Sequence, residues 1–186
     1  MTDIAKRKDL ARKQMFARRK EAHDHKNGRA ACDHLTAYLL DKAPHVISGY
    51  MPIRTEIDIL PAMTRLSRRH QICVPVVTGA ARPLEFHAWR PKMEMVEGAF
   101  GAAIPATGEI LTPTTVILPL LAFDSKGYRL GYGGGFYDRT LEKLRANSAV
   151  TTLGFAYSAQ EMDDVPTEPT DQKLDAIITE HGIRHF

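Results

Sequence analysis

The chain has 186 residues, of which 44% are hydrophobic and 25% charged, a balance that is usual for one globular domain. No apolar run approaches the roughly 20 residues of a transmembrane helix, and the basic N-terminus lacks the apolar stretch of a secretory signal. Cys32 and Cys73 have no CxxC partner, which excludes a zinc knuckle or a paired redox site. We therefore expect a single cytoplasmic domain over residues 1–186 with no membrane partner.

The formal net charge is only +3, but positive charge is concentrated near the N-terminus. Residues 1–30 hold four acidic side chains against ten basic ones, which are Lys6, Arg7, Lys8, Arg12, Lys13, Arg18, Arg19, Lys20, Lys26 and Arg29. Such a cluster can attract the phosphates of RNA or of a nucleotide, or it can solvate one face of a helix. Composition alone leaves these alternatives open.

Two helices are predicted at the N-terminal end. The apolar residues of the first share roughly one face, namely Leu10, Ala11, Met15 and Ala22, and Asn27-Gly28 breaks the pattern. The second helix carries a stripe made of Ala31, Leu35, Tyr38 and Leu39. It ends at Ala43-Pro44, because the residue before a proline is biased away from helical geometry.

From residue 45 onward, strand and helix patterns alternate. Short apolar runs predict strands over 45–50, 71–77, 84–89, 114–118, 150–156 and 174–179. Helical spacing separates them, first at Ile59, Met63 and Leu66, and later at Tyr137, Leu141 and Leu144. Residues 90–113 hold many of the prolines and glycines, so we expect a long ordered loop there.

This alternation predicts an α/β fold with a largely parallel open sheet, helices on both faces and an N-terminal helical pair. In such sheets, ligands bind outside the carboxyl ends of the strands. The loop after Tyr50, the loop after Leu118 and the segment before Leu174 are therefore candidate binding loops.

The loop after Leu118 contains four glycines within five residues, Gly131 and Gly133 to Gly135, just before a predicted helix. Glycine lets backbone N–H groups approach a ligand closely, and a helix N-terminus adds to the attraction for phosphate. Arg129 can add a guanidinium, and Asp138 can hold a divalent cation or cap the helix. The alternative is a flexible turn without a ligand, because the run is neither a Walker loop nor a dinucleotide fingerprint.

The stretch from Leu118 to Arg139, LPLLAFDSKGYRLGYGGGFYDR, resembles the signature of the 5-formyltetrahydrofolate cyclo-ligase family. Weaker matches lie at Lys8 with Arg12, over 49–58, at Phe100-Gly101 and over 160–175. Two positions depart from the family pattern: Ile104 stands where a glutamate is frequent, and Thr170 where a histidine often precedes the aspartate.

The resemblance implies an enzyme that converts 5-formyltetrahydrofolate, with or without a polyglutamate tail, to 5,10-methenyltetrahydrofolate. ATP would be the co-substrate and Mg²⁺ the metal, with release of ADP and phosphate. The formyl oxygen would attack the γ-phosphate, and N10 would then close the ring as phosphate leaves. Phosphoryl transfer is mainly positioning and charge neutralisation, so it needs no side-chain nucleophile.

The resemblance also implies the site residues. ATP would be bound by Lys8, Arg12, Arg129, Leu130, Gly131, Tyr132, Gly133, Gly134, Gly135, Phe136 and Tyr137. The folate would contact Met51, Glu56, Phe100, Tyr132, Gly133, Gly134, Gly135 and Phe136. Mg²⁺ would be held by Asp138 and Asp171. Simpler structural roles exist for several of these residues: solvated charges at Lys8 and Arg12, a helix cap at Glu56 and a turn at Asp171.

Two other functions remain open at this point. The basic N-terminal helices could bind RNA, but they are not interleaved with aromatic residues and no RNA-binding signature appears, so we expect no nucleic-acid partner. A sugar-phosphate isomerase or transferase on a similar scaffold would need a carboxylate base beside the phosphate loop and no ATP.

Overall fold

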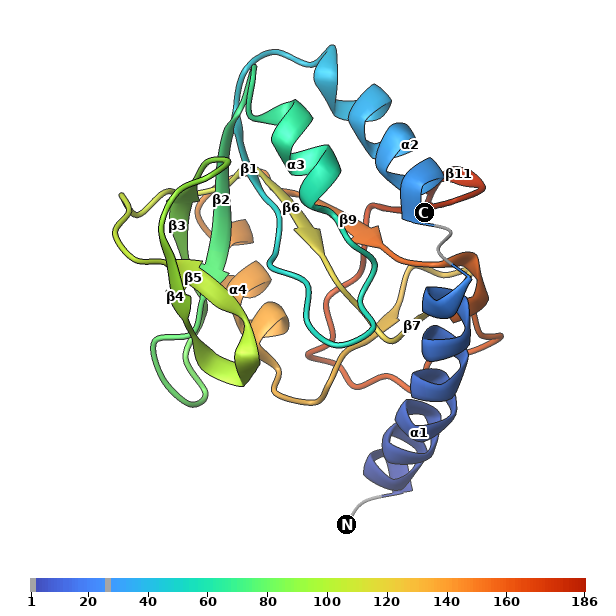
Figure 1. Ribbon diagram of the computed structural model, residues 1–186. Coiled ribbons are helices and arrows are strands. Elements are labelled where there is room, and N and C mark those ends of the chain that lie inside the picture. The colour runs from blue at the N-terminus through green and yellow to red at the C-terminus, as the bar shows by residue number, and fades with distance from the viewer. Residues whose placement is uncertain (1–2, 26–27) are drawn as a thin grey trace.

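The computed structural model describes residues 3–25 and 28–186, which fold around a seven-stranded sheet (Figure 1). Its spatial order is β11-β10-β9-β6-β1-β2-β3. These strands are β1 (Val46–Ser48), β2 (Gln71–Val76), β3 (Glu85–Trp89), β6 (Thr115–Leu118), β9 (Thr151–Phe155), β10 (Ala176–Thr179) and β11 (Gly182–His185). The five inner strands are parallel, while β3 and β11 pair antiparallel at the edges. The predicted, largely parallel sheet is confirmed.

Helices cover both faces of this sheet, as predicted. They are α1 (Asp3–Asp24), α2 (Gly28–Leu40), α3 (Leu60–Leu66) and α4 (Phe136–Arg145). In β6, Ile117 belongs to the core formed with α2 and α3, whereas Val116 and Leu118 belong to the core formed with α4. This is the alternation expected of a strand, and because both faces are buried the strand reads as one apolar run.

The order of the strands creates a switch point between β1 and β6. From β1 the chain passes through α3 to β2 on one side, and it later returns to the other side of β1 as β6. The two strands pair directly, with Ile47 opposite Thr115 and Ser48 opposite Val116. Their carboxyl ends therefore lie side by side, where parallel sheets of this kind bind ligands.

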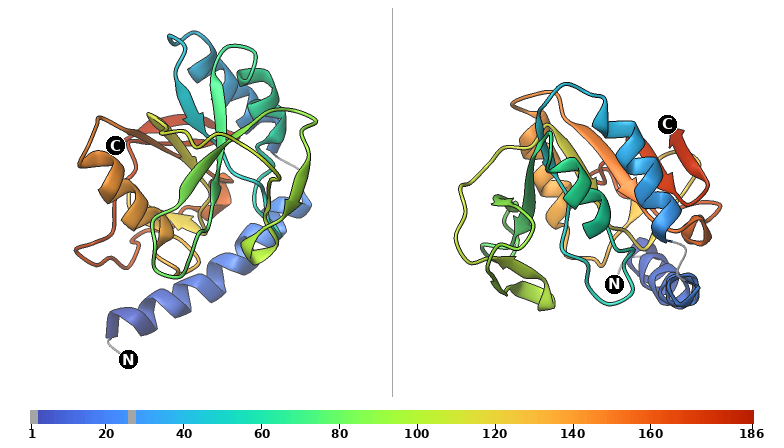
Figure 2. Two further views of the ribbon diagram at one scale, coloured as in Figure 1. Left: turned by 90° about the vertical axis from the view of Figure 1, so that its left-hand side faces the viewer. Right: turned by 45° about the horizontal axis from the view of Figure 1, so that its top comes forward.

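Helix α1 extends along one side of the body (Figures 1 and 2). Its Ala11 and Met15 share a core cluster with the small hairpin of β7 (Ala122–Phe123) and β8 (Arg129–Leu130). The hairpin turn is held by the fully buried Asp124, which accepts hydrogen bonds from the N–H groups of Lys126 (2.9 Å) and Tyr128 (3.0 Å). Asn27, part of the predicted helix break, lies outside the described residues. None of the helices within 3–25 and 28–186 is long and apolar enough to cross a bilayer.

The prediction of a long loop over residues 90–113 is wrong in part. This segment contains an antiparallel hairpin made of β4 (Met95–Glu97) and β5 (Ala103–Pro105), joined by the turn Ala99–Gly101. Three-residue strands are too short to give a clear alternating pattern among so many glycines and prolines. Gly98 permits the tight return, because a Cβ there would lie 2.7 Å from the carbonyl oxygen of Ala102.

Candidate active site

The glycine-rich run lies on the surface between β8 and α4. Residues 131–134 are exposed, and the backbone angle φ is +103° at Gly133 and +62° at Gly135. Side chains rarely adopt these angles, so glycine is required at both positions. Gly135 is also the N-cap of α4 and provides no side-chain cap.

Along this run, two carbonyl oxygens are hydrogen-bonded to arginine side chains while the N–H groups point to no acceptor among the described residues. The carbonyl oxygen of Gly131 accepts a hydrogen bond from Arg12 Nε (3.1 Å), and that of Gly134 accepts one from Arg139 Nη2 (2.7 Å). Within residues 3–25 and 28–186, none of the backbone N–H groups of residues 131–135 has a protein acceptor. The run therefore presents consecutive free donors beside a helix N-terminus and two guanidinium groups, which is a suitable site for a phosphate.

Arg129 and Asp138 form an ion pair beneath the run. Arg129 Nη2 lies 2.8 Å from Asp138 Oδ1, and the same oxygen accepts a hydrogen bond from the N–H of Gln172 at 3.0 Å. Arg129 also donates to the carbonyl oxygen of Gln172. These contacts join the glycine-rich loop to the segment before β10, so the carboxylate of Asp138 serves another element and not only its own helix.

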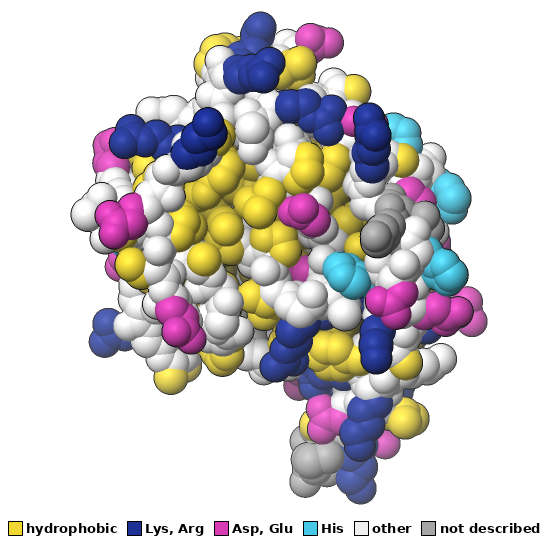
Figure 3. Space-filling model, viewed as in Figure 1, with side chains coloured by type: hydrophobic (Ala, Val, Ile, Leu, Met, Phe, Trp, Pro, Cys, Tyr) yellow, Lys and Arg dark blue, Asp and Glu magenta, His cyan; other side chains and the backbone are white. Residues whose placement is uncertain are grey.

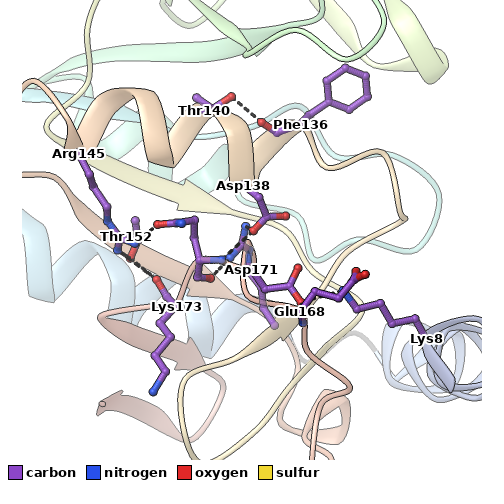
Figure 4. A network of polar contacts seen from close by, with 11 residues as sticks. Lys8, Phe136, Asp138, Thr140, Arg145, Thr152, Glu168, Asp171 and Lys173 are labelled. Carbon is purple, nitrogen blue, oxygen red and sulfur yellow. Dashed lines mark hydrogen bonds and ion pairs between the residues drawn. The ribbon is translucent and has the colours of Figure 1, made fainter. Parts of the chain in front are cut away.

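Lys8 connects α1 to the same segment, as Figure 4 shows. Its Nζ lies 2.7 Å from Glu168 Oε2 and 2.7 Å from Asp171 Oδ2. Burial lowers the pKa of Lys8, but its hydrogen bonds to Asp171 and Glu168 more than offset this, so the pKa is raised overall. Lys8 is therefore a buried, ion-paired positive charge and not a solvated one.

Asp138 and Asp171, the predicted metal ligands, lie on two segments that contact each other. They lie close together because the residue that follows Asp171 donates its N–H to Asp138. Among the described residues, the contacts of Asp138 use Oδ1 and those of Asp171 use Oδ2, which leaves one oxygen of each available. No group of three or more His, Cys, Asp or Glu side chains in these ranges could hold a metal alone. Two carboxylates supplemented by phosphate and water oxygens suit Mg²⁺.

The loop after β1 brings Glu56 to the other side of the run. Glu56 is buried, and its Oε2 accepts a hydrogen bond from the N–H of Ile53 at 3.0 Å. Tyr132 on the glycine-rich run also acts on this carboxylate, in the direction that lowers its pKa. Burial raises the pKa of Glu56, while the Ile53 N–H and the charge of Arg19 act in the opposite direction. A buried carboxylate is thus held close to Arg19 and Tyr132.

Apolar side chains lie on the loop after β1 and beside the glycine-rich run. Met51 is half-buried in the loop after β1. Phe100, at the tip of the β4–β5 hairpin, is 69% exposed and contacts Phe136 edge-on, with ring centroids 5.9 Å apart. In Figure 3, hydrophobic side chains gather near the centre of this face, with charged side chains around them. A flat, partly apolar ligand could lie here with a polar edge toward Glu56.

Two hollows on the surface lie away from the glycine-rich run. Their volumes are about 410 and 670 Å³, both lie beside the C-terminal half of α1, and neither is lined by residues of the glycine-rich run. We locate the site at the run because the backbone donors, the paired carboxylates and the switch point coincide there.

The structure thus brings together the three predicted loops and Lys8, Arg12 and Arg129. It also adds residues that the sequence did not single out, chiefly Arg19, Arg139, Glu168 and Gln172. Arg19 could have been found, since it lies four residues after Met15 on the stripe of buried residues of α1. Glu168 and Gln172, in the segment before β10, could not have been found from the sequence, because only the path of the loop brings them to Lys8 and Asp138.

Comparison with known proteins now identifies the relationship. The model of the 5-formyltetrahydrofolate cyclo-ligase family matches residues 4–180. The chain belongs to this family. A cyclo-ligase of Escherichia coli K12 is 30% identical over 159 residues, which cover 82% of this chain and 87% of the relative. One from Mycolicibacterium smegmatis is 30% identical over 145 residues and covers 72% of each chain.

Solved structures agree with the cyclo-ligase assignment. The NMR structure of Aquifex aeolicus 5,10-methenyltetrahydrofolate synthetase matches with a TM-score of 0.76 and 26% identity, covering 96% of this chain and 92% of that one. The resemblance based on the 118–139 signature is therefore confirmed, and the enzyme class is that of the cyclo-ligases. Membership also favours this class over the RNA-binding and isomerase alternatives.

Proposed function

We propose that this cyclo-ligase uses ATP and Mg²⁺ to convert 5-formyltetrahydrofolate to 5,10-methenyltetrahydrofolate, releasing ADP and phosphate. The observation that carries the proposal is the run of backbone N–H groups over residues 131–135 that have no acceptor in the described part of the chain, beside the buried carboxylate of Glu56. One side suits a polyphosphate, and the other suits the polar edge of a pterin.

On the phosphate side, the N–H groups of Gly131, Gly133, Gly134 and Gly135 would donate to phosphate oxygens, as in other anion nests. Lys8, Arg12 and Arg129 would neutralise the triphosphate. Leu130, Tyr132, Phe136 and Tyr137 would hold the run in shape. Tyr137 is half-buried and packs against the core cluster that contains Leu141, which favours this role.

On the folate side, Glu56 would accept paired hydrogen bonds from the amino-pyrimidinone edge of the pterin. Met51, Phe100, Phe136 and Tyr132 would provide apolar surface. The glycines of the run would lie between the two ligands, so that the formyl oxygen meets the terminal phosphate.

The proposed chemistry has two steps. The formyl oxygen first attacks the γ-phosphorus, breaking the bond to ADP and forming a phosphate ester. N10 then attacks the formyl carbon and releases its proton to solvent, and phosphate leaves with the formyl oxygen as the ring closes. This order is reasonable because the formyl oxygen is a poor leaving group until it is phosphorylated. The protein contributes position and charge, which is the main requirement of phosphoryl transfer.

Asp138 and Asp171 would hold Mg²⁺, each through the carboxylate oxygen that its protein contacts leave available. A bound divalent cation supplies charge neutralisation at the transferred phosphoryl group.

The test is direct. Purified protein mixed with 5-formyltetrahydrofolate, ATP and Mg²⁺ should develop the near-ultraviolet absorbance of 5,10-methenyltetrahydrofolate. Omission of ATP, or of Mg²⁺ with chelator added, should abolish the signal. Absence of the signal from protein that binds both ATP and folate would refute the proposal.

A further inference from the structure

Arg19 is a fully buried arginine that contacts three separate segments. Its Nε donates to Thr55 Oγ1 at 3.1 Å, in the loop after β1. Its Nη1 donates to the carbonyl oxygen of Leu120 at 3.4 Å, in the segment after β6. Its Nη2 donates to the hydroxyl of Tyr132 at 2.6 Å, in the glycine-rich run. Through one side chain, α1 therefore joins the loops that follow both strands of the switch point.

The guanidinium of Arg19 lies beside the carboxylate of Glu56. Arg19 Nη1 is 4.0 Å from Glu56 Oε1, and the exposed fractions of the two side chains are 1% and 3%. The Tyr132 hydroxyl accepts a hydrogen bond from Arg19, and Tyr132 also acts on Glu56 in the direction that lowers its pKa. The Arg19 guanidinium is also 5.3 Å from the centre of the Tyr132 ring.

Burial of a charged side chain is unfavourable unless it is paired and hydrogen-bonded. The stripe of buried residues on α1 otherwise contains alanine and methionine next to this position, so an apolar residue would suffice for packing alone. An arginine at this place, with its charge beside the carboxylate of Glu56, suits a role in the site.

We propose that Arg19 is a positioning residue: it holds Glu56 ionised and fixes Glu56 and Tyr132 relative to each other, so that the pterin side and the phosphate side of the site stay aligned. The inference deepens the proposed function and rests on it for the identity of the folate. Its electrostatic part concerns the protein without ligand and can be tested separately.

Glu56 has several charged or titratable neighbours. Arg19 on α1 and Arg54 on its own loop favour the carboxylate, as does Tyr132 on the glycine-rich run. The negative charge of Glu56 is in turn felt by the buried Tyr50 and the half-buried Tyr137. Of these two arginines, Arg19 is the one that lies outside the loop of Glu56, and its guanidinium is 4.0 Å from the carboxylate. Its removal should therefore raise the pKa of Glu56.

The experiment compares Arg19→Met, Arg19→Lys and Tyr132→Phe with the control Arg18→Met. Arg18 is the adjacent residue of α1, but it is exposed and contacts the carbonyl oxygen of Glu161. The carboxyl ¹³C shift of Glu56, assigned with Glu56→Gln, is titrated in ligand-free protein. The Kd for 5-formyltetrahydrofolate is then measured by calorimetry at several pH values.

We expect Arg19→Met to move the titration midpoint of Glu56 to higher pH and to weaken folate binding by roughly tenfold to a hundredfold at neutral pH. Arg19→Lys should return the midpoint toward that of the wild type, because it restores the charge. Tyr132→Phe should move the midpoint in the same direction as Arg19→Met, by less. Arg18→Met should match the wild type in both measurements.

An unmoved Glu56 midpoint in Arg19→Met overturns the proposal, whether or not the protein turns over folate. Folate binding in Arg19→Met as tight as in Arg18→Met also overturns it. If Arg19→Met does not fold, the test rests on Arg19→Lys and Tyr132→Phe. A Glu56 titration midpoint that is unchanged in Tyr132→Phe and raised in Arg19→Lys contradicts the roles assigned to Arg19 and Tyr132. Failure of the wild type to form methenyltetrahydrofolate would instead refute the proposed function and leave the titration result standing.

Discussion

Gly131 offers a way to separate phosphate binding from stability. A Cβ added at Gly131 would have nothing within 4 Å, and its φ lies outside the left-handed region. Alanine at such a position stabilises a protein by about 0.4–1 kcal/mol, because the unfolded chain loses conformational freedom. For a domain of this size, that corresponds to a rise in Tm of about 1–4 °C.

The empty space beside Gly131 is, in our proposal, the space a phosphate oxygen occupies. We therefore expect Gly131→Ala to weaken ATP binding at least about tenfold, the free-energy equivalent of one lost hydrogen bond, while Tm does not fall. Gly133→Ala should lower both the affinity for ATP and Tm, because φ is +103° at this position and the added Cβ would lie 3.1 Å from the Arg12 guanidinium. Positive φ in alanine costs of order 1–3 kcal/mol.

The control is Gly182→Ala at the first residue of β11. Its φ is +126° and its Cβ would also have nothing within 4 Å, so it measures the cost of positive φ away from the site. Tm is measured by calorimetry and the ATP Kd by titration, with Gly182→Ala expected to lower only Tm. Wild-type ATP affinity in Gly131→Ala would refute the assignment of phosphate to this run.

Three further predictions concern single side chains. Asp138→Asn should lower Mg²⁺-dependent turnover, measured as kcat against Mg²⁺ concentration, more than it weakens folate binding; equal losses would indicate a purely structural carboxylate. Glu56→Gln should raise the KM for folate by roughly tenfold and leave the ATP Kd unchanged, and an unaltered KM would remove Glu56 from the site. Burial lowers the pKa of His70 below 6.5, so the unfolded state binds more protons and stability, complete above pH 6.5, should decline below it. Urea unfolding from pH 7.5 to 5 should show this decline and lose part of it in His70→Gln, whereas identical curves would exclude His70.

The sequence predicted the fold where local patterns and general topology agree. Buried strands such as β6 are apolar on both faces, which separates them clearly from the amphipathic α4. The hairpin of β4 and β5 and the pair β7 with β8 were missed because strands of two or three residues carry almost no periodicity. Their pairing depends on tight turns, such as that at Gly98, and on buried turn residues such as Asp124.

The site divides in a similar way. The glycines of the run are recognisable because their chemistry is local: consecutive donors and positive φ need glycine whatever surrounds them. The partners of Lys8 and Asp138 are not local, since Glu168 and Gln172 reach the site from the segment before β10. A sequence pattern can indicate the charges that need partners, but only the arrangement of the loops shows which partners they have.

Helix α1 shows the consequence most clearly. Its basic residues could be a solvated face or an attraction for phosphate, yet Lys8 and Arg19 both lie on its buried stripe, together with Ala11 and Met15. Lys8 is bound by carboxylates before β10, and Arg19 is bound by the loops after β1 and β6. The helix therefore joins the loops that follow separate strands, and its charges replace the apolar contacts that packing alone would use. The glycine-rich run supplies the donors, but α1 determines where those donors stand relative to Glu56 and Asp171.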